Sequence, residues 1–177
     1  MITLHGIIQQ LYRQRLFVCM SFFFLCSFSS LQAQPQQPPR PIIIYTNPAQ
    51  GLFFGAFYHG AAGGTVIVYP DGSRSTTGDV VQLGLGHLFS PAIIEVEAPL
   101  GTRLGILNGM DAVLSGSNGG TMTMEVGSSN VGSHFVTTVV APGRTQVRVG
   151  GILYVGNILA NPPGAYSGMF QITFVQE

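Results

Sequence analysis

From Ile42 to the C-terminus, apolar and polar residues alternate with a period of two, and this pattern constrains the fold more than any other feature of the chain. Successive side chains of a β-strand point to opposite faces, so such a stretch buries one face and exposes the other. No window of ten or more residues carries the 3.6-residue period of an amphipathic helix. The alternating stretches are residues 94–97, 121–126, 146–149 and 170–174, together with residues 65–69, which are apolar on both faces and predict a fully buried strand.

Turn-forming sequences separate these stretches. Asn-Gly and Asp-Gly favour tight hairpins because both central residues tolerate positive φ, and a spacing of order 10–20 residues is typical of a sandwich or barrel. We therefore predict one all-β domain over residues 42–177, an immunoglobulin-like (pilin-like) β-sandwich of roughly eight to ten strands. The last stretch, Tyr166–Glu177, predicts a single long closing strand. The turn signals are Pro70-Asp71-Gly72, Asn108-Gly109, Asn118-Gly119-Gly120, Pro142-Gly143 and Pro162-Pro163-Gly164.

The first 33 residues have the composition of an export signal. Arg13 and Arg15 precede an uncharged apolar run, Leu16–Phe28, whose length fits a signal-peptide core and falls short of the roughly 20 residues that cross a membrane. Small residues then lead to a cleavage point after Ala33. The alternative is an uncleaved N-terminal anchor. The signal predicts export to the periplasm, the outer-membrane surface or the medium.

Residues 34–41 (QPQQPPRP) contain four prolines and predict an extended spacer ahead of the domain. Both cysteines, Cys19 and Cys26, precede this spacer, so the exported chain has no thiol and no disulfide. It carries five scattered arginines, seven acidic residues and no lysine. Without a basic patch, nucleic acid is an unsuitable partner.

The exported chain lacks the residues that several catalytic mechanisms require. Without cysteine and lysine it has no thiol nucleophile, Schiff base or Walker lysine, and it has no G-x-S-x-G elbow. Gly84-Leu85-Gly86 begins like a dinucleotide-binding loop, but Phe89 replaces its third glycine and no helix follows. Glu95 and Glu97 share one strand face about 6.6 Å apart, which we interpret as a solvated face. We expect no enzyme activity, no catalytic residues and no cofactor.

Two sets of residues are candidate metal ligands. His59, His87 and His134 are far apart in the sequence and form no ligand-spaced pair, so loop polarity explains them better. The segment Asp71–Asp79 offers several oxygens, which calcium prefers. The alternative is a hairpin in which Asp71 caps its own turn, and this alternative is favoured. We predict no metal site and leave calcium open.

Four stretches resemble members of a bacterial domain-of-unknown-function family, number 4402. The resemblance covers about residues 40–177 and implies an exported, surface-associated sandwich of immunoglobulin or pilin type, with no known activity. The pattern from Gly164 to Thr173 also looks like the terminal strand of spore-coat-U-type and fimbrial subunits. The four stretches are Val68–Gly78, Ser115–Met124, Val149–Gly156 and Ala160–Phe174.

These observations lead to two functional hypotheses. The first is a fimbrial or pilin-like structural or adhesion subunit that associates with protein partners, including itself, through strand addition. Residues 42–46 are either the donated strand or, as we favour, the first strand of their own domain. The second hypothesis is a secreted carbohydrate- or ligand-binding module, for which the candidate contact residues are the aromatics Phe57, Tyr58, Phe89 and Tyr154.

Overall fold

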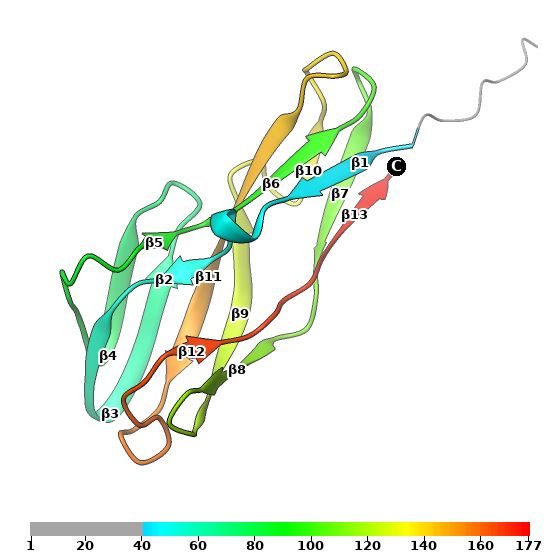
Figure 1. Cartoon of the computed structure of the whole chain (residues 1–177). Coiled ribbons are helices and arrows are strands. Elements are labelled where there is room, and N and C mark those ends of the chain that lie inside the picture. Colours follow the sequence, from blue (N-terminus) through cyan, green and yellow to red (C-terminus); the bar gives the residue numbers. More distant parts are fainter. Residues whose placement is uncertain (1–40) are drawn as a thin grey trace, which may run out of the picture. The chain divides into compact units, whose positions relative to one another are not determined.

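The computed structural model describes residues 41–177, which belong to one compact unit, Arg40–Glu177. The predicted export signal and nearly all of the predicted spacer lie outside the described residues. The described chain is an all-β sandwich of antiparallel strands, as the alternation predicted (Figure 1). No helix in it is long and apolar enough to span a membrane. The elements are β1 (Ile43–Thr46), η1 (Pro48–Gln50), β2 (Phe53–Phe54), β3 (Phe57–Val68), β4 (Arg74–Gln82), β5 (Phe89–Ser90), β6 (Ala92–Glu97), β7 (Arg103–Asn108), β8 (Ala112–Gly116), β9 (Thr121–Ser129), β10 (His134–Val136), β11 (Thr145–Val155), β12 (Tyr166–Ser167) and β13 (Ile172–Gln176).

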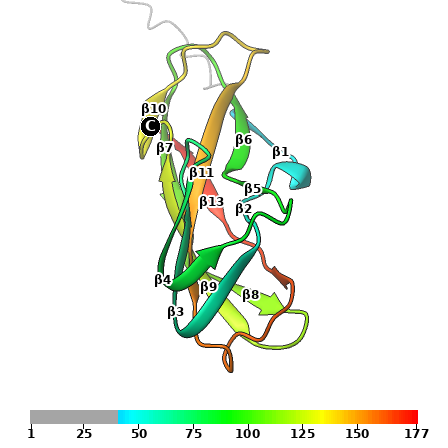
Figure 2. The ribbon, with the colours of Figure 1, turned by 90° about the vertical axis from the view of Figure 1, so that its left-hand side faces the viewer.

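The long strand β11 joins the two ends of the domain (Figure 2). Its N-terminal half pairs with β6 and its C-terminal half with β3, while β9 pairs along the other edge. The largest sheet adds β1 next to β6, β4 next to β3, and β8 and β12 beyond β9. Two smaller sheets, β10-β7-β13 and β2-β5, contribute Leu104, Ile106 and Phe54 to the same hydrophobic core.

The alternation predicted from the sequence is confirmed in the central strands. In β9, Met122, Met124 and Val126 are buried and the residues between them exposed, and β6 and β11 bury every second residue along their alternating segments. The prediction that residues 65–69 are buried on both faces is wrong. Val66 and Val68 are in the core, but Thr65 and Ile67, on the other face of β3, are only half-buried, and Tyr69, just past its end, is 41% exposed.

The closing segment is two short strands, and the prediction of one long strand was wrong. β12 pairs with β8 in the large sheet, whereas β13 pairs with β7 in the three-stranded sheet. Between them, Gly168 crosses so close to β8 that a Cβ would overlap the backbone of Val113. Phe170, in the crossing, packs on the core. The alternation continues through the crossing, and it therefore does not reveal the change of sheet.

Strand β1 completes the edge of its own sheet, as favoured from the sequence. It pairs antiparallel with β6, with Tyr45 opposite Glu95. The Tyr45 hydroxyl donates to the Glu97 carboxylate at 3.1 Å, and the Arg144 guanidinium stacks 3.5 Å from the Tyr45 ring centroid. Ile42, just before β1, packs on the core, whereas Ile43 and Ile44 remain 46% and 39% exposed.

Candidate functional site

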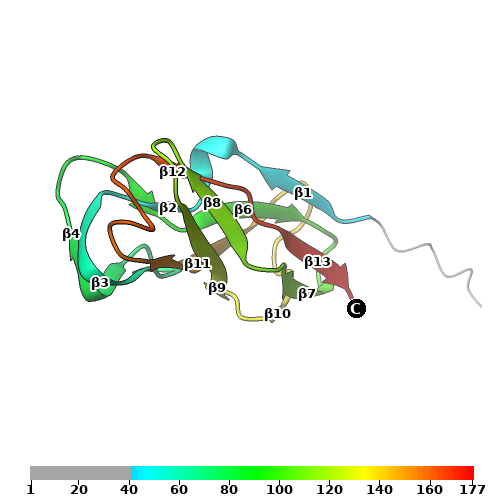
Figure 3. The ribbon, with the colours of Figure 1, turned by 90° about the horizontal axis from the view of Figure 1, so that it is seen from below.

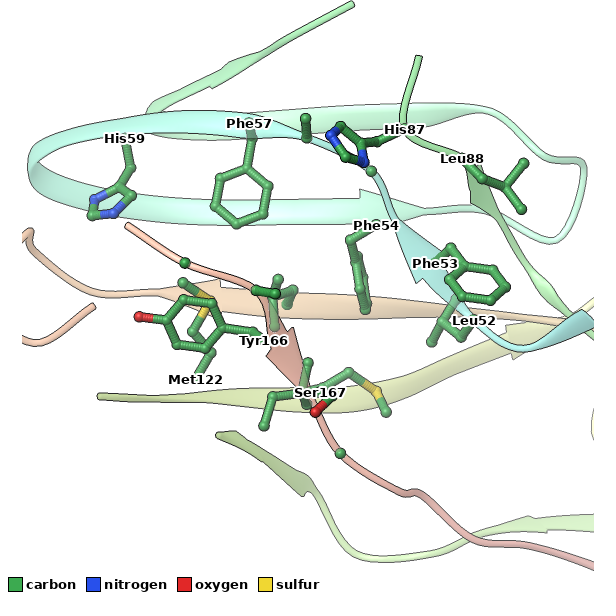
Figure 4. A pocket seen from close by; sticks show the side chains of 18 of the residues that line it. Leu52, Phe53, Phe54, Phe57, His59, His87, Leu88, Met122, Tyr166 and Ser167 are labelled. Carbon is green, nitrogen blue, oxygen red and sulfur yellow. The ribbon is translucent and has the colours of Figure 1, made fainter. Parts of the chain in front are cut away.

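An apolar groove of about 930 Å³ lies in the described part of the chain. Its floor is formed by inward-facing side chains of β8, β9 and β11, namely Leu114, Met122, Met124 and Leu153. Phe57 projects into it from β3 (Figure 4). None of its lining residues is Asp, Glu, Lys or Arg. Such a lining suits an apolar segment or ligand and does not suit a charged substrate.

Two short strands with free edges border the groove. Within residues 41–177, β2 pairs only with β5 and β12 pairs only with β8. Both lie in front of β11 in Figure 1, and the view from below places them on the same side of it (Figure 3). An unpaired strand edge presents main-chain N–H and C=O groups to any added strand. The Phe54 carbonyl of β2 already accepts from the Arg74 guanidinium at 2.8 Å, and the groove combines apolar walls with the remaining main-chain groups of the two strand edges.

A glycine-rich loop forms one rim of the groove, and the sequence alone did not identify it. Leu83, Leu85 and Leu88 line the groove from this loop, between β4 and β5. Leu85 and Leu88 are 68% and 60% exposed. The sequence supports only the interpretation of Gly84-Leu85-Gly86 as a loop that does not bind a dinucleotide. The leucines at every second or third position of this loop were the sequence signal that could have identified the rim, because loops seldom place several large apolar side chains in solvent.

The interpretation of His59 as a polar loop residue is wrong. His59 lies on β3 and is 8% exposed, and its Nε2 is 3.0 Å from the backbone oxygen of Asn161. Asn161 is itself 2% exposed; its side chain donates to the Thr121 carbonyl at 2.6 Å and accepts from the Gly156 N–H. His59 and Pro162, the residue after Asn161, both line the groove, so this buried network lies next to it.

The other two histidines are exposed and lie apart from His59. His87 lines the groove from the Leu83–Leu88 loop. His134, at the start of β10, contacts Glu177 at 3.0 Å and Ser133 at 3.1 Å. Within residues 41–177, no three His, Cys, Asp or Glu side chains are close enough together to hold a metal ion.

The oxygens considered for calcium lie at two separate places on the β3–β4 hairpin. Asp71 is in the connecting turn, where its carboxylate accepts from the Ser73 N–H at 2.8 Å and from the Ser73 hydroxyl at 2.6 Å. Asp79 lies beyond the Gly64–Gly78 pair, where it accepts from the Ala62 N–H at 3.0 Å. Each carboxylate therefore stabilises local backbone, and the hairpin holds the two apart.

The turn contacts of Asp71 predict a small pH-dependent contribution to stability. Hydrogen bonds from Ser73 lower the pKa of Asp71 below its usual 3.8. A carboxyl whose pKa is lower in the folded chain stabilises it above the unfolded pKa, and this contribution is lost as the pH falls through the folded value. The difference in melting temperature between wild type and Asp71→Ala should stay constant from pH 7 to pH 5 and shrink below about pH 4. A difference that grows on acidification would contradict this role.

The paired carboxylates and two of the four aromatic candidates lie outside the groove. Glu95 accepts from Arg144 at 2.9 Å and Glu97 from Tyr45, which fits the solvated face interpreted from the sequence. The Arg74 guanidinium stacks 4.4 Å from the Phe89 ring centroid. Tyr154 donates to Glu125 at 2.7 Å on the outer face of the sheet, and this hydrogen bond raises the pKa of Tyr154. Of the four aromatics, Phe57 and Tyr58 line the groove.

Comparison with known proteins identifies a family. The family described as Domain of unknown function (DUF4402) matches residues 44–175. This span covers all of the groove and every strand with a free edge beside it. No curated protein and no solved structure matches the chain.

Proposed function

The chain belongs to the family described as Domain of unknown function (DUF4402), and from the geometry of its groove we propose that it is a non-enzymatic, exported structural or adhesion subunit of fimbrial, pilin-like type. Its partners are other protein chains, further copies of itself included, and they bind by strand addition. The composition of residues 1–33 supports export to the bacterial envelope or surface.

The observation that carries this proposal is the uncharged apolar groove between two free strand edges. A strand laid between β2 and β12 would gain main-chain hydrogen bonds from both strands and bury the side chains of one of its faces against the floor. Left open, the same surface exposes apolar side chains and unpaired backbone to water, which soluble monomers usually avoid. Strand addition removes both disadvantages at once.

Placing charge on the groove rim is expected to weaken association. Leu85→Asp with Leu88→Asp should reduce self-association of the exported protein about tenfold or more, because an inserted strand would desolvate two carboxylates. Both leucines are more than half exposed, so the fold should be retained. Size-exclusion chromatography with light scattering and an unheated SDS gel measure the effect.

The matched control carries the same two charges outside the groove. Leu107→Asp with Leu159→Asp replaces leucines that are 57% and 91% exposed and do not line the groove. It should associate like the wild type. Equal association of both double variants would show that the groove does not mediate association. A wild type that stays monomeric at all concentrations would contradict assembly by strand addition.

A second candidate function is binding of a small apolar ligand. The volume of the groove is within the range of ligand pockets, and Phe57 and Tyr58, two of the aromatics expected to contact ligand, line it. An apolar fluorescent dye that binds the monomer stoichiometrically, and loses affinity in the Leu85→Asp, Leu88→Asp variant, would favour this function. A carbohydrate ligand is less suited to a lining so poor in polar side chains.

A further inference from the structure

We propose that the strand that fills the groove is β1, Ile43–Thr46, of a second copy of the chain, with Ile42 at its start. This inference rests on the proposed function and names the partner at the same site. It assigns β1 two positions: the edge of its own sheet, as observed, and the groove of a neighbour in the assembly.

The chemistry of the β1 segment matches that of the groove. Residues 42–46 read Ile-Ile-Ile-Tyr-Thr and carry no charge, like the groove lining. On its own sheet, the segment leaves Ile43 and Ile44 46% and 39% exposed. Because Ile43 and Ile44 point to opposite faces of the strand, one of the two would lie against leucine, methionine and phenylalanine between β2 and β12, and its transfer to the groove removes apolar surface from water.

Leaving its own sheet costs β1 its pairing with β6 and the contact of Ile42 with the core. It is an edge strand that pairs only with β6 among the described strands. The contacts of Tyr45 with Glu97 and Arg144 lie on the half-buried outer face, where solvent weakens hydrogen-bonded and cation–π contacts. In the groove the same strand would lie between β2 and β12 and gain main-chain partners there, apart from the Phe54 carbonyl, which already accepts from Arg74.

The chain leaves β1 directly at the groove. Asn47 and the short helix η1 (Pro48–Gln50) follow β1, and Pro48 and Gly51 line the groove. A β1 strand released from β6 would thus pivot at the rim of its own acceptor groove and reach outward. When each donor strand enters the groove of a different copy, the contact is head-to-tail and propagates into a chain of subunits.

A reversible disulfide tests whether β1 must leave its own sheet. Ile43 and Glu97 are directly opposite in the β1–β6 register, so Ile43→Cys with Glu97→Cys, in a chain that also carries Cys19→Ala and Cys26→Ala, should lock β1 in place. The oxidised variant is expected to assemble at least about tenfold less than the same protein after reduction. Light scattering on the exported protein measures both states, and circular dichroism checks that each is folded.

The control lock joins two strands that the proposal leaves in place. Leu107 and Thr173 are opposite each other in the β7–β13 register and both exposed, so Leu107→Cys with Thr173→Cys should assemble equally in both redox states. If the oxidised Ile43→Cys, Glu97→Cys variant assembles as well as the control variant, β1 is not the donor strand. The proposal of strand addition would then require another donor segment. If no variant and no wild type assembles, the proposed function fails, and this inference fails with it.

A second experiment identifies the contact directly. Two single-cysteine proteins in the same Cys19→Ala, Cys26→Ala background, Ile44→Cys and Leu88→Cys, are mixed and treated with a short bismaleimide. A crosslinked heterodimer is expected, because Leu88 lies on the groove rim and Ile44 in the donated strand. Ile44→Cys mixed with Leu107→Cys should give none. In a chain that carries both Ile44→Cys and Leu88→Cys, crosslinks that form only within one chain would overturn exchange between copies.

Discussion

Gly64→Ala is expected to lower the free energy of unfolding by about 2–5 kcal/mol, the sum of backbone strain and overpacking. Gly64 has φ +156°, and a Cβ there would overlap the carbonyl oxygen of Thr77 on β4 and press on Val80. The residue lies at the register shift of the β3–β4 hairpin, opposite Gly78, which has φ +65°. A side chain at this position must push the two strands apart.

Urea denaturation of Gly64→Ala and of Gly84→Ala measures this effect with a matched control. Gly84, in the loop at the groove rim, has no positive φ, and a Cβ added to it would meet no other atom within 4 Å. Gly84→Ala should change stability by less than about 1 kcal/mol, in the stabilising direction, because it restricts the unfolded chain. Equal losses in the two variants would show that contact with β4 is not the cause.

Asn161→Leu is expected to destabilise the domain by about 2–5 kcal/mol. The substitution leaves the Gly156 N–H and the Thr121 carbonyl without their side-chain partner, and each buried, unpaired polar group costs about 1–3 kcal/mol. The bond from His59 to the Asn161 backbone oxygen does not depend on the side chain. The variant therefore isolates the amide group.

Asn118→Leu is the control for this change, since Asn118 is exposed and donates one hydrogen bond, to the Pro163 carbonyl at 2.6 Å. It should cost less than about 1 kcal/mol. Denaturant midpoints with unchanged slopes give both values. Asn161→Leu should also reduce assembly at temperatures near its unfolding transition, because the unfolded chain has no groove. A stability equal to wild type would show that water replaces the lost amide.

The strand pattern could be predicted from the sequence because it is a local property. Burial of Met122 and Met124 but not of Thr123 follows from alternation alone. The turn at Pro70-Asp71-Gly72 follows from the side chain of Asp71 and the positive φ of Gly72. Each of these features depends on residues a few positions apart.

The candidate site could not be predicted in the same way. His59 is buried because the loop that contains Asn161 closes over it, 102 residues later in the chain. The closing stretch changes sheets at Gly168, although its alternation continues. Leu85 and Leu88 become a groove rim only because β12 and Phe170 lie across from their loop. A residue pattern records which face a side chain takes and does not record which strand comes to lie opposite it.

By itself the sequence determined that this chain is built from antiparallel strands with one apolar face each, because side-chain direction in a strand depends only on position along it. Only the tertiary structure decided which edges are paired and which are free. That choice depends on contacts between distant segments: β1 takes the edge of β6, whereas β2 and β12 each keep an open edge beside the groove. Hydrogen-bonding edges look alike in every strand, and their partners are selected by packing.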